Sequence, residues 1–281
     1  RRITHVLLRR SDLRFPFPDD MAERLNGKRV LAVRRRAKYL LIDLEDGTVF
    51  LSHLGMSGRY TIITSDEVAR LDAGSSPRPN SPFGELTGFD GRHDHMEFRF
   101  SDGSVSVYTD PRRFGIADVF DRAEEPIQSL LEHLGPEPFD DWNATIAAQR
   151  IGQKRSAIKT TLLDQRFVVG VGNIYACEAL HRSGIAPTTP SNVLVRKNGA
   201  PTKRLERLVD EVKSVLNAAI AVGGSTLNDF AAVDGTLGYF GHHFQVYDRE
   251  DGPCLKEGCN GTIERIVQSN RSTFLCPRCQ K

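Results

Sequence analysis

The sequence is poor in several features that mark special classes of protein. Its 281 residues include five cysteines, one tryptophan and three methionines, and no apolar run is long enough to cross a membrane as a helix. No secretory signal peptide is visible. Four of the cysteines are spaced as C-x4-C and C-x2-C, which suits a metal in a reducing compartment better than a disulfide framework. These features argue against a membrane-spanning or disulfide-rich secreted protein and predict a cytoplasmic one.

Net charge is also nearly absent, at +2, so the total says little about partners. The distribution says more, because six basic residues and no acid lie between residues 26 and 42. They are Lys28, Arg29, Arg34, Arg35, Arg36 and Lys38. Such a run is usually a solvated face, but on a strand it would form a basic stripe that can follow phosphates. Both interpretations stay open from the sequence alone.

The chain has no initiator Met, and a strand pattern begins at Ile3 without any lead-in. We therefore expect that the natural start of the polypeptide is missing.

The first part of the chain is rich in short β patterns. Seven segments of β-branched and aliphatic residues are interrupted by turns such as Asp46-Gly47 and Asp102-Gly103, which predicts antiparallel hairpins and a sandwich. The stretch from Ser65 to Gly91 is predicted to be a long surface loop. Helices are predicted for residues 156–164 and 173–181, and a longer one after Thr202.

The four paired cysteines, Cys254, Cys259, Cys276 and Cys279, predict a closed tetrahedral site for one structural Zn²⁺. Four thiolate ligands leave no open coordination position for chemistry, and an iron–sulfur cluster is the alternative. Cys177 stands alone on a predicted helix and is interpreted as a small core residue.

Two turns carry residues with no obvious core role. In YTDPRRFG, the turn begun by Asp110 presents Arg112, Arg113 and Phe114, which suit base edges, phosphates or a wedge between stacked bases. In HLGMSG, Met56 is either a core gap-filler or a probe that enters the base stack. The alternative for the first turn is a salt-bridged loop without a DNA-binding role.

Two further motifs are ambiguous. VVGVGNIY lacks the third glycine of a dinucleotide-binding loop, so we interpret it as a double turn that feeds a helix at Asn173, where free N–H groups can hold phosphate. A connector without a ligand is equally compatible. RHDH contains an H-x-H pair, but a structural or phosphate-facing role for His93 and His95 is favoured over a metal site.

In this order the motifs closely resemble the bacterial formamidopyrimidine-DNA glycosylase family, repair enzymes that excise oxidised purines such as 8-oxoguanine. The resemblance spans essentially the whole chain. It rests on RRAKYLL, HLGMSG, RHDH, YTDPRRFG, LGPEP, VVGVGNIYACEAL, GGSTLNDF, GYF with QVY, and the Arg-bearing cysteine hairpin. It implies duplex DNA containing oxidised purines or abasic sites as the partner, and a monomer.

The resemblance also implies the fold class, which is α+β and multidomain. An antiparallel β-sandwich would occupy residues 1–121. A helical domain with a helix-two-turn-helix and a lesion-capping loop would occupy residues 122–238, and a zinc-finger β-hairpin would occupy residues 239–281. DNA would be held in the cleft between the domains.

Residue roles follow from the same resemblance. Lys38 and Arg271 would be catalytic, since both would grip phosphate and assist strand elimination. Met56, Arg112 and Phe114 would fill the gap left by the flipped base. The remaining DNA contacts would be His53, His93, Arg113, Lys154, Asn173 and Tyr239, with Arg155 as an alternative to Lys154.

The sequence departs from the family pattern in two places. The first cysteine pair is spaced C-x4-C where the family commonly has C-x2-C. The family's nucleophilic N-terminal proline and its glutamate, in a segment P-E-L-P-E, are absent, so we expect residues 1–281 alone to bind damaged DNA weakly and catalyse little.

The leading hypothesis is therefore base excision by a bifunctional glycosylase and lyase with β- and δ-elimination. The alternatives are a non-catalytic protein that binds damaged DNA and a glycosylase for oxidised pyrimidines from the sister branch. A bacterial cytoplasmic location, associated with the nucleoid through DNA, is expected.

Overall fold

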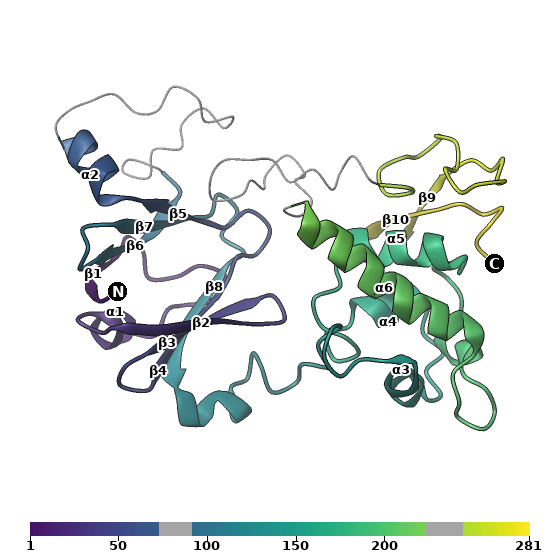
Figure 1. Ribbon diagram of the computed structural model, residues 1–281, viewed down its shortest axis with the longest axis horizontal. Helices are drawn as coiled ribbons and strands as arrows, with labels where there is room; N and C mark the ends of the chain where they lie inside the picture. The colour runs from purple at the N-terminus through teal and green to yellow at the C-terminus, as the bar shows by residue number, and fades with distance from the viewer. Residues whose placement is uncertain (73–91, 223–243) are drawn as a thin grey trace. The chain divides into compact units, whose positions relative to one another are not determined.

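The computed structural model describes residues 1–72, 92–222 and 244–281 (Figure 1). The described residues divide into two compact units, one of residues 1–72 and 92–132 and one of residues 133–222 and 244–281. Each unit has its own apolar core. Within these ranges, no helix is both long and apolar enough to span a membrane. The three predicted domain boundaries stay a prediction.

The first unit is a sandwich of two antiparallel four-stranded sheets, with strand orders β1-β6-β7-β5 and β2-β3-β4-β8. The strands of the first sheet are β1 (Ile3–Leu8), β5 (Arg59–Ile63), β6 (Asp94–Phe100) and β7 (Val105–Thr109). Those of the second are β2 (Val30–Arg36), β3 (Tyr39–Leu44), β4 (Thr48–His53) and β8 (Ile116–Asp121). Seven of the eight were predicted. Strand β8 was not, because two aspartates interrupt its apolar pattern.

Side chains from both sheets share one core, which confirms the predicted sandwich. Phe50 of one sheet and Phe98 of the other lie with ring centroids 5.4 Å apart. The short helix α1, Met21–Leu25, adds Met21 and Leu25, both fully buried. Each such side chain stabilises the fold by about 1.5–3 kcal/mol relative to its exposed state.

Both predicted Asp-Gly turns are present. Gly47 and Gly103 adopt φ values of 89° and 79°. The carboxylates of Asp46 and Asp102 each accept the backbone N–H two residues further on, at 3.1 Å. These local bonds fix the turns and hence the register of the strands that they join.

The loop prediction was wrong for residues 65–72, which form helix α2, Ser65–Asp72. Thr64 and Glu67 make a capping box: the Thr64 N–H donates to Glu67 Oε2 at 3.0 Å, and the Glu67 N–H donates to Thr64 Oγ1 at 3.4 Å. The polar residues that suggested a loop are the ones that start a helix. The remainder of the predicted loop, residues 73–91, lies outside the described residues.

The second unit contains the three predicted helices and one more. The predicted ones are α4 (Ile158–Leu163), α5 (Asn173–Ser183) and α6 (Lys203–Ala221), whereas α3 (Ala144–Ile151) was not predicted. The 3-10 segments are η1 (Arg122–Ile127) in the first unit and η2 (Ser191–Leu194) in the second. Thr202 caps α6 by accepting the Leu205 N–H at 3.3 Å. The turns of residues 164–172 join α4 to α5, which gives the helix-two-turn-helix.

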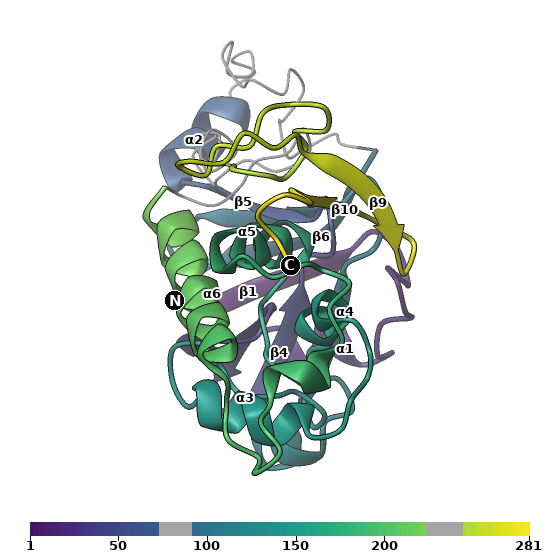
Figure 2. The same ribbon diagram turned by 90° about the vertical axis from the view of Figure 1, so that its right-hand side faces the viewer.

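A two-stranded ribbon completes the second unit. Strands β9 (Glu264–Gln268) and β10 (Arg271–Leu275) pair antiparallel. Helix α5 lies between α6 on one side and β10 on the other (Figures 1 and 2). Because α5 contacts both, it is the element on which the helices and the ribbon meet.

The basic run of the sequence is partly neutralised. Lys28 pairs with Asp46 at 2.8 Å. Arg34 holds Asp43 through two bonds of 2.7 and 2.8 Å, and it also pairs with Glu125 of η1 at 2.8 Å. Lys28 and Arg34 therefore have acidic partners within the unit, while the basic-stripe interpretation of the run stays a prediction.

Asp43→Asn is expected to destabilise the first unit by about 1–3 kcal/mol at pH 7, since it removes a charged acceptor that is 2% exposed. The Arg34 guanidinium holds the pKa of Asp43 below its usual range. Its contribution is therefore present above pH about 4 and lost as the pH falls through the folded-state pKa. Hydrogen exchange of the β2 and β3 amides at pH 7 and at pH 3 measures both effects.

The matched control is Asp66→Asn, on the exposed side of α2. Fluorescence of Trp142, buried in the second unit, should report little change in either variant. Equal exchange in Asp43→Asn and the parent chain at pH 7 would contradict the assignment.

Candidate nucleic-acid interface and metal centre

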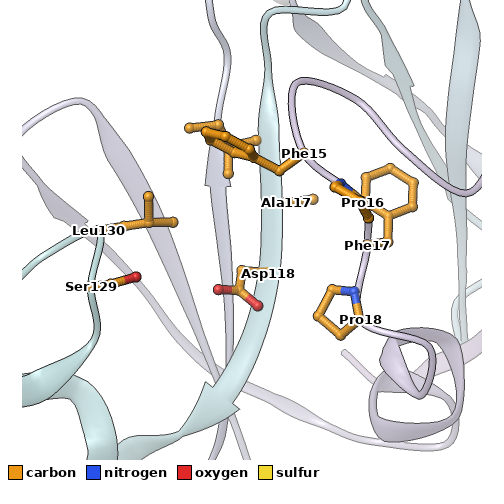
Figure 3. Close-up of a pocket in the computed structure, with 9 residues that line it drawn as sticks. Phe15, Pro16, Phe17, Pro18, Ala117, Asp118, Ser129 and Leu130 are labelled. Carbon is orange, nitrogen blue, oxygen red and sulfur yellow. The ribbon is translucent and has the colours of Figure 1, made fainter.

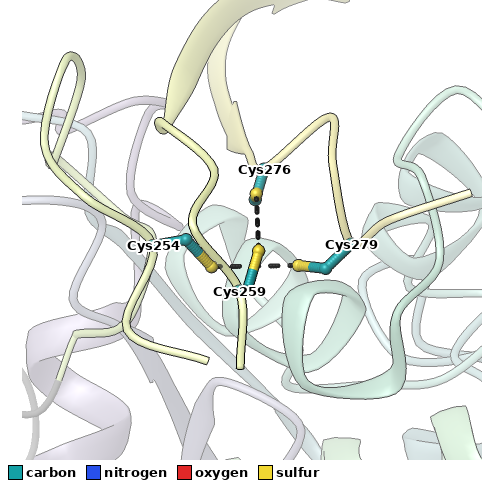
Figure 4. A group of neighbouring side chains, drawn as sticks. All are labelled: Cys254, Cys259, Cys276 and Cys279. Atoms are coloured by element: carbon teal, nitrogen blue, oxygen red, sulfur yellow. Dashed lines mark hydrogen bonds between the residues drawn. The ribbon is translucent and has the colours of Figure 1, made fainter. Parts of the chain in front are cut away.

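The four predicted metal ligands come together in space (Figure 4). The sulfur atoms of Cys254, Cys259, Cys276 and Cys279 all lie within 4.8 Å of one another. Two of the sulfur pairs are separated by 3.8 and 3.7 Å. Tetrahedral ligands with Zn–S bonds of about 2.3 Å stand about 3.8 Å apart, so these two separations match a zinc site.

The chemistry of the sulfurs also fits a cation. Burial first, and then the neighbouring thiols, raise the pKa of Cys279 well above its ordinary value. Four sulfurs this close ionise together only when a cation compensates them, so metal binding releases protons. The backbone at residue 261 comes so close to the cysteines that only glycine fits, since a Cβ there would lie 2.6 Å from the Cys276 sulfur.

A tight turn presents Arg271 beyond the metal site. Gln268 and Arg271 face each other across a two-residue loop, Ser269-Asn270, with φ values of 49° and 58°. Two consecutive left-handed residues are the mark of a type I′ hairpin, and Asn tolerates that region well. The turn therefore explains why Asn270 precedes Arg271, whose side chain is exposed.

Two side chains that reach from α4 and α5 hold β10 next to Arg271. The Asn173 amide donates to the Ser272 carbonyl at 2.9 Å. Lys159, only 1% exposed, donates to the same carbonyl at 3.3 Å and to Thr273 Oγ1 at 2.5 Å. Burial lowers the pKa of Lys159, and the Arg271 charge lowers it further. Sequence reasoning did not single out Lys159, because a lysine in a basic segment gives no sign of being buried.

Asn173 begins α5, as predicted, and one of its amide hydrogens is engaged by the ribbon. Its phosphate-contact role stays a prediction. Lys154 is exposed in the segment between α3 and α4, where its N–H binds the Ile151 carbonyl and its own carbonyl accepts the Asn192 N–H, both at 2.9 Å. Arg155 is exposed beside it.

In the first unit, one buried carboxylate organises the two predicted DNA-contacting turns. Asp110 is fully buried. Its Oδ1 accepts from the Ser57 hydroxyl at 2.6 Å, and its Oδ2 accepts from the Gly115 N–H at 2.8 Å and the Tyr108 hydroxyl at 3.3 Å. Ser57 Oγ in turn accepts the Arg112 N–H at 3.2 Å. The sequence suggested only that Asp110 starts a turn.

The two turns are packed directly together. A Cβ on Gly55 would lie 2.6 Å from the Phe114 carbonyl carbon, so that no other residue fits there. Met56 is 57% exposed and Phe114 47% exposed, while the Arg112 guanidinium lies 6.0 Å from the Phe114 ring. Met56 lies on one of these two packed turns, and Arg112 and Phe114 lie on the other. The role of Met56 as a probe stays a prediction. Arg113 is exposed with φ 57°.

His53 contacts Gly55 of the HLGMSG turn, and Lys38 lies close enough for its charge to act on His53. Lys38 is exposed in the β2–β3 turn, after Ala37 at φ 54°. Burial first, and then the charges of Lys38 and Arg14, lower the pKa of His53 to about 4. His53 Nδ1 accepts the Gly55 N–H at 2.9 Å, so the neutral ring carries its proton on Nε2. His53 is therefore a hydrogen-bond donor without charge at pH 7.

The H-x-H pair separates into two roles. His95 is buried, and its Nε2 lies 2.8 Å from the Asp110 carbonyl oxygen. His93 is exposed, and its carbonyl accepts the Asp110 N–H at 3.0 Å. His95 thus has the structural role that was favoured, while the DNA-contact role of His93 stays a prediction. Tyr239 and the predicted capping loop lie outside the described residues.

A pocket of about 430 Å³ in the first unit is separate from these residues. Strand β8 runs between the Pro16–Pro18 segment and Ser129–Leu130, which form its sides (Figure 3). Its lining includes Phe15, Ala117 and Asp118 and none of the predicted site residues.

Three family models match the chain. The formamidopyrimidine-DNA glycosylase N-terminal domain matches residues 1–117, the formamidopyrimidine-DNA glycosylase H2TH domain matches residues 134–231, and the zinc finger found in FPG and IleRS matches residues 252–281. Together with the sulfur geometry, the last match assigns one structural Zn²⁺ to the four cysteines.

Relatives similar over nearly the whole chain carry the name of the same family. The chain is 48% identical to the formamidopyrimidine-DNA glycosylase of Sinorhizobium fredii over 278 residues, which are 98% of this chain and 91% of that protein. It is 47% identical to that of Beijerinckia indica over 279 residues, covering 99% and 92%.

Among solved structures, a complex of Lactococcus lactis Fpg with DNA that contains an abasic site is similar, with a TM-score of 0.81 and 27% identity over 100% of this chain and 92% of that one. MutM in complex with DNA containing carbocyclic 8-oxo-G also has a TM-score of 0.81. The chain therefore belongs to the formamidopyrimidine-DNA glycosylase family, which consists of glycosylases and abasic-site lyases of base excision repair.

Proposed function

We propose that this protein, when its chain carries the family's N-terminal Pro-Glu segment, removes oxidised purines such as 8-oxoguanine and formamidopyrimidines from duplex DNA. It would then nick the strand by β- and δ-elimination. The observation that supports this most directly is the exposure of Met56, Arg112 and Phe114 on two turns that pack together and that Asp110 fixes. An enzyme that extrudes a base needs rigid groups to occupy the vacated space.

The lesions bound by similar proteins support the same substrate class. L. lactis Fpg variants have been solved with DNA containing Fapy-dG, and MutM with DNA containing carbocyclic 8-oxo-G. We extend these lesions, and abasic sites, to this chain. The location that we infer is the bacterial cytoplasm, on DNA.

In the first unit, Met56 and Phe114 would enter the base stack, and Arg112 would contact the orphaned opposite base. Lys38 would bind a phosphate near the lesion and assist elimination. Because His53 Nε2 donates without carrying charge, His53 would hold a phosphate oxygen without competing with Lys38 for protons. Arg113 and His93 would add backbone contacts.

In the second unit, Arg271 would grip phosphate and assist the δ-step. Asn173 and Lys159 hold the residue after it, so the guanidinium stands on a fixed strand. Asn173, with the N–H groups of the first turn of α5, and Lys154 would bind the phosphate backbone. Tyr239 is proposed as a further contact.

One observation favours a second candidate function. L. lactis Fpg has also been solved with DNA that contains an oxidised pyrimidine. Oxidised pyrimidines are therefore the alternative substrate, and damage recognition without catalysis is the alternative from the binding class.

Asp110→Asn is expected to weaken binding to a lesion-containing duplex by roughly 5- to 100-fold, because losing one charged acceptor loosens both turns at a cost of about 1–3 kcal/mol. Zinc content should not change, since the metal lies in the other unit. Fluorescence anisotropy with an abasic-analogue duplex measures the affinity. Asp118→Asn, in the same unit on β8, is the matched control. Equal affinity of Asp110→Asn and the parent chain would show that the Asp110 carboxylate is not needed for DNA binding.

Arg271→Ala is expected to keep zinc but to reduce DNA binding and strand nicking, whereas Cys276→Ala should lose both zinc and binding. Zinc analysis and a gel assay of nicking separate the two. Arg265→Ala, on the partner strand of the ribbon, controls for a general loss of positive charge. Normal nicking by Arg271→Ala would show that the ribbon has no role in the reaction.

Borohydride trapping of residues 1–281 preceded by a Pro-Glu-Leu-Pro-Glu segment tests the activity. We expect a covalent adduct with an 8-oxoguanine duplex and little with an undamaged one. An adduct only with oxidised pyrimidines would support the second candidate function. Tight binding without any adduct would support damage recognition without catalysis. Parallel assays of residues 1–281 with and without a preceding Pro-Glu-Leu-Pro-Glu segment test where the nucleophile stands.

A further inference from the structure

Helix α5 presents two fully buried polar side chains, Glu178 and His181, toward the zinc ribbon. They are three residues apart, so they lie on the same face of the helix, one turn after the other. Glu178 binds the segment that precedes the first cysteine, and one ring nitrogen of His181 contacts a cysteine sulfur.

Glu178 fixes the entry of the chain into the ribbon. Its carboxylate accepts the backbone N–H groups of Gln245, Val246 and Tyr247 at 3.0, 3.0 and 2.9 Å. A charged acceptor with three donors is a strong anchor inside a protein. The position of the ribbon on α5 is therefore set independently of the metal.

His181 reaches the metal ligands themselves. Its Nε2 lies 3.2 Å from the sulfur of Cys254. A zinc-bound thiolate has no proton to give, so the hydrogen in this contact belongs to the imidazole, and Nε2–H donates to sulfur. The backbone N–H of Lys256, inside the first cysteine pair, also donates to the Cys254 sulfur.

Electrostatics gives this contact a function. Four thiolates around Zn²⁺ carry a net charge of −2, and a buried anion is costly unless donors surround it. N–H groups that donate to the ligands reduce that cost and orient the ligand atoms. The ribbon supplies donors from its own backbone, and His181 adds one from a different element, the second helix of the helix-two-turn-helix.

We propose that His181 is a positioning residue of the zinc centre: its Nε2–H···S bond to Cys254 slows zinc release and couples the metal to helix α5. The first turn of α5 carries Asn173, whose amide donates to the Ser272 carbonyl of β10, next to Arg271. Helix α5 therefore contacts the ribbon both at the metal site and near the hairpin turn.

Zinc transfer to a chromogenic chelator tests the proposal with the zinc-loaded full chain. His181→Phe removes the donor and retains a ring, and it should release zinc about 10- to 100-fold faster. His181→Gln keeps a side-chain N–H and should lie between Phe and the parent. His5→Phe, an exposed position in the first unit, should release zinc at the parent rate.

Two further measurements separate this role from simple packing. In the Co²⁺-substituted protein, His181→Phe should shift the thiolate-to-cobalt charge-transfer band, which a loss of packing alone would leave unchanged. The variant should also reduce the stability of the metal-loaded form more than that of the metal-free form. Parent-like release and an unshifted band in His181→Phe, or equal destabilisation of the two forms, would overturn the proposal.

Discussion

The carboxylate of Asp110 is the constraint on which the exposed surface of the first unit depends. A fully buried anion must be satisfied by donors, and here they come from Ser57, Tyr108 and the Gly115 backbone. Because the donors belong to both turns, satisfying the charge also fixes the turns relative to each other. Apolar and cationic tips can then stay exposed without an apolar core beneath them to hold them in place.

In the second unit, a metal site and a helix hold the exposed hairpin of Arg271 in place. A ribbon with few apolar residues has little core of its own, so the sulfur cluster replaces one. Helix α5 carries Asn173, Glu178 and His181, and each contacts a different part of the ribbon. The helix that begins at the glycine-rich double turn is thereby the common support of the metal and of Arg271.

Much of this could be predicted from the sequence, because the signals are local. Strand alternation, Asp-Gly turns, the Thr202 cap and the cysteine spacing each depend on neighbouring residues. The motifs also located Met56, Arg112 and Phe114, which lie on two turns that the fold packs together.

The rest depends on contacts between distant segments, which no local pattern encodes. Asp110 looks like a turn residue until Ser57 is placed beside it, and Lys159 looks like a surface lysine until β10 covers it. Arg34 looks like a phosphate ligand until Asp43 and Glu125 are seen around it. His181 gives no signal at all, since a histidine inside a helix is compatible with many environments.

The direct contact of Gly55 with the Phe114 backbone also bears on how this surface can evolve. The close contact of the two backbones leaves almost no room for a larger residue at Gly55, whereas the side chains of Met56 and Phe114 are exposed. Selection can therefore alter Met56 or Phe114 at less cost in folding than Gly55. The exposed tips of these turns can therefore diverge among descendants of this chain while the scaffold beneath them stays the same.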